Sequence, residues 1–150
     1  MKITEKYKFG FDAWALGLFV LVMIPNLFWF GVPAPNDILR TVSVAPVTDT
    51  IGAALQVLMI ASLCMVKNKN AGKMQLSPLI ICVIACLAVY YTGWCLFYSG
   101  IVGKLVIGLL TLSPCIAFVL YATDRKNLPA ILFASGFMLC HVVFGVVNYM

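Results

Sequence analysis

A few side chains that could do chemistry lie inside long apolar runs of this 150-residue chain. They include one histidine, His141, and two amides, Asn26 and Gln56. A polar group in hydrocarbon is costly unless it has a partner, so an ionisable residue there indicates a functional site by default. The chemistry that these groups offer is hydrogen bonding and, for the imidazole, proton exchange.

An aromatic face accompanies these polar groups. Tyr91, Trp94 and Tyr98 follow one another at the spacing that places side chains on one face of a helix. Counted at about 1.5 Å per residue, the two amides lie about 8–9 Å below the outer membrane surface and the imidazole about 13 Å below it. We therefore expect the amides, the imidazole and the aromatic face to line one outward-opening pocket for a ligand.

Each of these residues also has a structural interpretation. Asn26 follows Pro25, whose ring frees the carbonyl of Leu21, so the amide can repair a kink. Gln56 can join two helices by a hydrogen bond. The aromatic residues fit the belt found at membrane surfaces. A neutral histidine bonded to a neighbouring helix has the same weight as a ligand-binding one.

Other reactive residue types indicate no site. The six cysteines fall within the apolar runs and form no Cys-x-x-Cys pair, so a redox centre is not expected. With one histidine and no carboxylate expected deep in the membrane, a metal site is not expected either. No nucleophile context supports a catalytic triad. We predict a protein that is not an enzyme, with no catalytic residue, no metal and no cofactor.

The composition is that of a membrane protein. The chain is 63% apolar and 10% charged, whereas soluble domains are about 45–50% apolar and about 25% charged. Short connections predict helices that are antiparallel to their neighbours in sequence. We predict an all-α membrane protein, a single compact domain of five transmembrane helices. The five apolar runs cover residues 11–30, 50–66, 76–98, 101–121 and 130–149.

The basic residues predict the orientation. Cytoplasmic loops carry an excess of lysine and arginine, and an N-in/C-out arrangement leaves only Arg40 and Lys104 outside. A cleaved signal peptide is the alternative for the first run, but the length of that run and the proline at Pro35 favour a retained span. The basic residues flank apolar runs, so nucleic acid is not an expected partner. The cytoplasmic set comprises Lys2, Lys6, Lys8, Lys67, Lys69, Lys73, Arg125 and Lys126.

The longest connection covers residues 31–49 and is expected outside the membrane. Ile38 and Leu39 belong to a predicted helical turn and are expected at the membrane surface. Asp37 and Arg40 are three residues apart and are expected to pair on its wet side. Such a surface pair contributes under about 1 kcal/mol. We treat these two residues as candidate lid residues over the pocket.

Two resemblances add to these expectations. Residues 24–30, IPNLFWF, followed by 32–37 and Arg40, resemble a group of small uncharacterised bacterial multi-pass membrane proteins, over about the first 60 residues. This resemblance implies a bacterial inner membrane. The size and five-span plan resemble the TspO/translocator family, which binds tetrapyrroles and sterols. That family's binding residues do not map onto positions of this chain.

The sequence favours a protein that binds a small hydrophobic molecule or a lipid, as a component of a transporter. The alternative is a non-enzymatic accessory or scaffold protein that packs against a partner. Membrane lipids are expected partners in both cases, and both allow a homo-oligomer or a membrane partner protein. Convergence of the polar residues in one cavity would favour ligand binding, and polar residues on separate lipid-facing sides would favour the scaffold.

Overall fold

The computed structural model describes residues 3–149 and is helical over most of that length. Five of its helices are long and apolar enough to cross a membrane, which indicates a multi-pass membrane protein and confirms the prediction of five long apolar helices. Some helix ends differ from the predicted ends. The second long helix begins earlier than predicted, at Pro46, because proline is favoured in the first turn of a helix. The helices are α2 (Ala13–Gly31), α3 (Pro46–Met65), α4 (Pro78–Tyr98), α5 (Lys104–Asp124) and α6 (Leu128–Tyr149).

Shorter elements lie at the ends of these helices. The turn η1 lies where the helical turn is predicted. The sequence does not predict β1 and β2, because they are short, contain lysines and pair over a long distance in the chain. Their antiparallel pairing places Tyr7 opposite Asn68 and Lys8 opposite Lys67. The short elements are α1 (Ile3–Lys6), β1 (Tyr7–Phe9), η1 (Ile38–Arg40) and β2 (Val66–Asn68).

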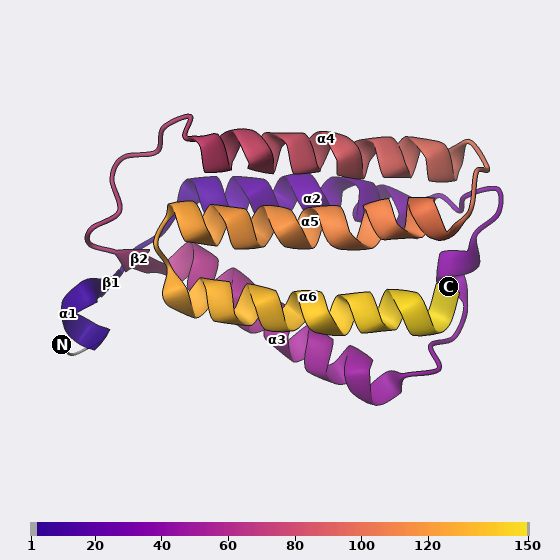
Figure 1. Ribbon diagram of the computed structural model, residues 1–150. Helices are drawn as coiled ribbons and strands as arrows, with labels where there is room; N and C mark the ends of the chain where they lie inside the picture. Colours follow the sequence, from indigo (N-terminus) through magenta and orange to yellow (C-terminus); the bar gives the residue numbers. More distant parts are fainter. Residues whose placement is uncertain (1–2, 150) are drawn as a thin grey trace.

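Helix α5 lies at the centre of the arrangement. In the most apolar 18-residue stretch of α5, 61% of the residues are buried, against 22–28% in the corresponding stretches of the other four long helices. It packs against α4 on one side and α6 on the other, and α6 packs against α3 (Figure 1). Helix α2 makes fewer close contacts with its neighbours. We call the end with β1 and β2 the basic end, and the end with residues 32–45 the loop end.

Glycines allow two pairs of helices to approach closely. A Cβ atom on Gly93 of α4 would lie 3.1 Å from the Cβ atom of Leu109 in α5. A Cβ atom on Gly136 of α6 would lie 3.3 Å from Leu55 Cδ1 in α3. Small residues at helix crossings are typical of membrane proteins, where close backbone approach contributes to association. These two contacts fix α4 on α5 and α3 on α6.

Candidate functional site

A cavity of about 360 Å³ lies among the five long helices. Every long helix contributes to its wall, and Leu39 from η1 closes it at the loop end. Most of the wall is apolar or aromatic. The side chains on it that can form hydrogen bonds include Asn26, Trp29, Gln56, Tyr90, Trp94, Thr111, His141 and Tyr149.

Four residues that the sequence groups as candidate ligand contacts line this one cavity. Asn26 comes from α2 and Gln56 from α3, while Trp94 comes from α4 and His141 from α6. These positions are far apart in the chain, so only the helix packing brings them together. The arrangement is a mostly apolar cavity with a few polar groups at its wall, which is the usual character of a small-molecule site.

Asn26 forms a hydrogen-bonded group with Tyr90. The Asn26 amide nitrogen donates to the Tyr90 hydroxyl at 2.7 Å and to the carbonyl of Val22 at 2.9 Å. The Tyr90 hydroxyl in turn donates to the same carbonyl at 3.0 Å. Tyr90 is only 2% exposed. This group joins α2 to α4 at the cavity wall, so Asn26 has a structural role as well as its place on the wall.

Trp94 has a polar atom without a partner. The residue is 6% exposed, and its ring meets Tyr90 and Phe97 edge to face, with centroids 6.3 and 5.8 Å away. Its buried indole Nε1 forms no hydrogen bond of normal geometry among residues 3–149, although it lies beside Tyr90. A buried donor left unsatisfied costs about 1–3 kcal/mol. A molecule in the cavity that offers an acceptor would remove that cost.

His141 lies between two phenylalanines of its own helix. Its ring stacks on Phe137, with centroids 5.1 Å apart, and lies nearly parallel to Phe144 at 6.3 Å. The three residues are spaced so that they share one face of α6. Within the described part of the chain no hydrogen bond to the imidazole is formed, and the residue is half-buried. The aromatic neighbours hold the ring in its orientation along α6.

A second hollow of about 300 Å³ lies between α3 and α6. It shares Gln56, Phe137, His141 and Phe144 with the first cavity, so these side chains form the boundary between the two spaces. Asp49 lines the second hollow, and its buried Oδ1 atom has no hydrogen-bond partner within residues 3–149. The Asp49 carboxylate therefore has an unsatisfied oxygen in the hollow that adjoins the cavity.

Tyr91 and Tyr98, also candidate contacts, do not line either space. The Tyr91 hydroxyl donates to the carbonyl of Leu21 at 2.7 Å. This is the carbonyl that Pro25 frees in α2, so Tyr91 repairs the helix where the sequence assigns that role to Asn26. The Tyr98 hydroxyl donates at 2.6 Å to the carbonyl that follows the end of α2. Both tyrosines thus hold α4 against α2.

Tyr90 is the wall residue that the sequence does not single out. It precedes Trp94 by one helical turn and therefore shares its face. Tyr91 also lies near that face, and the spacing alone does not decide which of two adjacent tyrosines points inward. The position of α2 decides it, because the carbonyl of Leu21 accepts a hydrogen bond from the Tyr91 hydroxyl.

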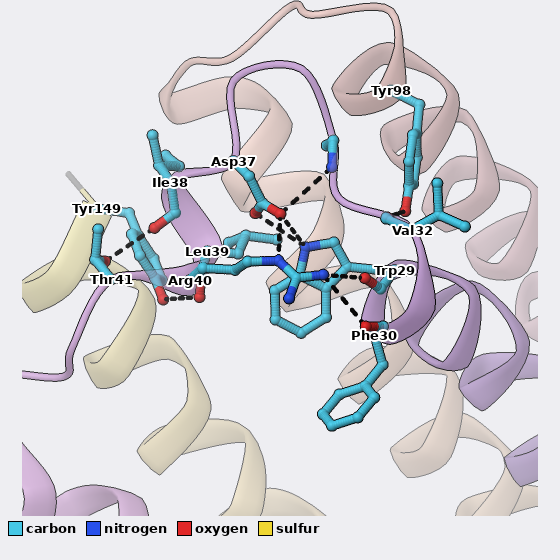
Figure 2. Close-up of polar contacts among 11 residues, drawn as sticks. Trp29, Phe30, Val32, Asp37, Ile38, Leu39, Arg40, Thr41, Tyr98 and Tyr149 are labelled. Carbon is cyan, nitrogen blue, oxygen red and sulfur yellow. Dashed lines mark hydrogen bonds and ion pairs between the residues drawn. The ribbon is translucent and has the colours of Figure 1, made fainter.

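At the loop end, Asp37 accepts hydrogen bonds from several donors (Figure 2). Trp29 Nε1 donates to its carboxylate oxygens at 2.9 and 3.0 Å, and Arg40 Nε donates at 2.8 Å. The Arg40 guanidinium also lies 4.9 Å from the centroid of the Trp29 ring. The side chain of Asp37 is only 10% exposed, against 40% for Arg40. The predicted pair forms; Arg40 is exposed, whereas the carboxylate of Asp37 is covered by Trp29 and Arg40.

Ile38 and Leu39, which the sequence predicts at the membrane surface, are half-buried. Both pack against the core, and Leu39 lines the cavity. The carbonyl of Leu39 accepts a hydrogen bond from Tyr149 at 3.4 Å, which ties η1 to the end of α6. The amide of Asn36 donates to the carbonyl of Gly100 at 3.0 Å. These hydrogen bonds anchor the loop to α6 and to the turn between α4 and α5, and so hold Leu39 over the cavity.

The environment of Asp37 determines its pKa. Burial raises the pKa of this carboxyl, but hydrogen bonds from Trp29 and Arg40 outweigh burial and lower the pKa below its ordinary value. A lowered folded-state pKa stabilises the fold above the unfolded-state pKa, which is about 3.9 for aspartate. That contribution is lost as the pH falls through the lower, folded-state pKa.

We expect Asp37→Asn to lower the free energy of unfolding by about 1–3 kcal/mol at neutral pH, because hydrogen bonds to a charged acceptor are replaced by weaker ones. The difference between variant and wild type should shrink as the pH falls below about 4. Equilibrium unfolding in detergent micelles at both pH values measures it. A difference of the same size at low pH would show that the charge of Asp37 does not stabilise the loop.

Comparisons with known proteins supply no relative from which a function could be transferred. No protein-family model, no curated protein and no solved structure matches the chain. The resemblances to small bacterial membrane proteins and to the TspO/translocator family stay predictions. The cavity and its wall residues carry the functional interpretation.

Proposed function

We propose that the protein binds a small hydrophobic molecule or a lipid in the cavity among its five long helices, as a component of a transporter. The observation that carries the proposal is that four candidate residues from four helices line the same cavity: Asn26, Gln56, Trp94 and His141. If these side chains only joined helices, each would be expected to have its partner on a neighbouring helix. Asn26 has such a partner, whereas the indole of Trp94 has none within residues 3–149.

The wall sets the chemistry of the ligand. Sites for small molecules have volumes of about 300–1,000 Å³, and the cavity, at about 360 Å³, lies near the lower limit. The apolar lining favours a molecule whose surface is largely hydrocarbon or aromatic. Trp94 supplies a donor, so the ligand should carry at least one hydrogen-bond acceptor. His141 can donate or accept, depending on which ring nitrogen carries the proton.

The hollow between α3 and α6 provides the route of entry. It borders the cavity through Gln56 and His141, and the loop end is covered by η1. A molecule dissolved in the membrane would therefore enter sideways between two helices, and not through the loop. Asp49 lies on this route and can interact with a polar group of the entering molecule.

We further propose that the basic end lies in the cytoplasm of a bacterial cell and that the loop end lies outside its inner membrane. The excess of lysine and arginine at the basic end supports this orientation. The cavity then lies in the outer half of the membrane.

Cysteine labelling should show the orientation directly. On a cysteine-free background, we expect cysteine at Asn70 to react with an impermeant reagent only from the cytoplasmic side. Cysteine at Asn36 should react only from outside. Both residues are exposed, so failure to react from one side reports the membrane and not burial. Reversed labelling would overturn the orientation and place the cavity in the inner half.

Native mass spectrometry from mild detergent tests the proposed function. We expect the wild-type protein to carry a bound molecule and Trp94→Phe to retain it about tenfold less, because the change removes the donor but keeps an aromatic ring. Tyr98→Phe is the matched control, since it also removes a donor from α4 and keeps an aromatic ring, but Tyr98 lines neither space. A wild-type protein without a bound molecule, or equal retention by both variants, would support the scaffold interpretation.

A further inference from the structure

A separate cavity of about 350 Å³ lies at the basic end. The ribbon of β1 and β2 and the segment that follows β2 form much of its wall. Among residues 3–149, Asp12 is the single carboxylate that lines it, and Trp14 and Met74 add apolar surface. The basic residues that line it are Lys8, Lys67, Lys69, Lys73 and Arg125.

The ribbon directs its lysines to one side. Successive side chains of a strand point to opposite faces. The side chain of Asn68 lies on one face of β2, where it donates to the carbonyl of Lys126 at 2.7 Å. Lys67 and its cross-strand partner Lys8 therefore lie on the opposite face. Like charges directly opposite each other destabilise a strand pair. An anion between the two lysines would relieve this repulsion.

In the described part of the chain, the charges of these lysines are not balanced by ion pairs. Arg125 lies 3.7 Å from a carboxylate oxygen of Asp124 and 4.0 Å from one of Asp12, and it donates to the carbonyl of Gly72 at 2.8 Å. Its charge is thus compensated, and it holds the segment after β2 in place. Across residues 3–149, no ion pair involves a lysine of this cavity. The cavity therefore carries an excess of positive charge.

An apolar groove of about 610 Å³ begins beside this cavity. It shares Trp14 and Met74 with the cavity, so the two spaces adjoin. It runs between α2 and α4, where Gly17 leaves room and Leu87 forms part of the wall. The exposed polar lining of the groove is minor, which suits a hydrocarbon chain. Its position also follows from packing, because α2 makes few close contacts with α4.

We propose that an anionic phospholipid occupies these two spaces, with its phosphate group among the lysines and an acyl chain in the groove between α2 and α4. The charge of the cavity matches the headgroup, and the groove matches the chain. The order of the two spaces is also that of the lipid, because the basic cavity lies at the end of the spans and the groove runs along them. This site is distinct from the central cavity and does not rest on the function proposed for it.

Lipid titration of the full-length protein in nonionic detergent, followed by native mass spectrometry, tests the proposal. We expect dioleoyl phosphatidylglycerol to bind more tightly than dioleoyl phosphatidylcholine. Lys67→Gln should weaken the binding of phosphatidylglycerol about fivefold, the effect of one basic residue near an anionic surface. Lys104→Gln removes the same charge at the loop end and should leave binding unchanged. Equal binding of the two lipids, or equal effects of the two variants, would overturn the proposal.

A change in the groove distinguishes a lipid from a soluble phosphate. A side chain at Gly17 would meet no atom within 4 Å of its Cβ, so Gly17→Leu fills the groove without a clash at the backbone. We expect this variant to bind phosphatidylglycerol more weakly, whereas Gly108→Leu, a helix position with equal space, should not. If inorganic phosphate stabilises the wild type as strongly as the lipid does and Gly17→Leu changes nothing, the cavity binds a soluble phosphate and the lipid proposal is wrong.

Discussion

Replacing Asp12 by alanine is expected to lower the free energy of unfolding by about 2–5 kcal/mol, because a helix cap and a hydrogen bond to a charged acceptor are lost together. Asp12 is 8% exposed. Its carboxylate accepts from the backbone nitrogens of Trp14 and Ala15 at 3.1 and 3.3 Å, and from the Tyr121 hydroxyl at 3.0 Å. The carboxylate thus caps α2 and joins it to α5, and it also lies near the guanidinium of Arg125.

Two further variants separate these contributions. Asp12→Asn keeps an N-cap acceptor but removes the charge, so it should lose less stability than the alanine variant. Tyr121→Phe removes only the hydroxyl and should cost about 0.5–1.5 kcal/mol. Equilibrium unfolding in mixed micelles, followed by tryptophan fluorescence, compares the three. A loss under about 1 kcal/mol for the alanine variant would mean that Asp12 acts only as an ordinary cap.

The importance of Asp12 is not visible in the sequence. It lies at the start of an apolar run, where a carboxylate reads as a residue at the edge of the membrane. Its partners Tyr121 and Arg125 come from the far end of the chain. The pairing of β1 with β2 is equally hidden in the sequence, because α2 and α3 lie between these two strands along the chain. Local patterns carry no information on such contacts.

The five long helices, by contrast, follow from local properties. Each apolar run has the length that crosses a hydrocarbon core, and within a membrane a helix satisfies its own backbone hydrogen bonds. The grouping of Asn26, Gln56, Trp94 and His141 follows from their similar depth. The choice between Tyr90 and Tyr91 does not, because it depends on which helix lies beside α4.

The loop end shows how packing changes the role of a predicted element. The local sequence predicts a turn at residues 38–40 and a pair between Asp37 and Arg40, and both occur. It does not predict that Trp29 donates to the carboxylate or that Leu39 reaches the cavity. These contacts turn a surface loop into a cover over the site.

Changes at His141 are expected to have the largest effect on ligand retention. His141→Ala and His141→Leu should both reduce the bound fraction by about tenfold or more, because a hydrogen-bonding group at the cavity wall is lost in each. The two variants should differ in stability. Leucine preserves much of the contact with Phe137 and Phe144, whereas alanine removes it and enlarges the cavity. Native mass spectrometry measures the ligand, and unfolding in micelles measures stability.

The comparison with leucine separates binding from packing at His141. Leu139→Ala is the control on the same helix, since Leu139 is 66% exposed and lines neither space. Loss of ligand in the leucine variant, with stability close to the wild type, would assign the imidazole to ligand binding. Retention of ligand by both His141 variants would contradict that assignment. The polar wall residues would then serve to join helices, and the protein would be better described as a scaffold for a membrane partner.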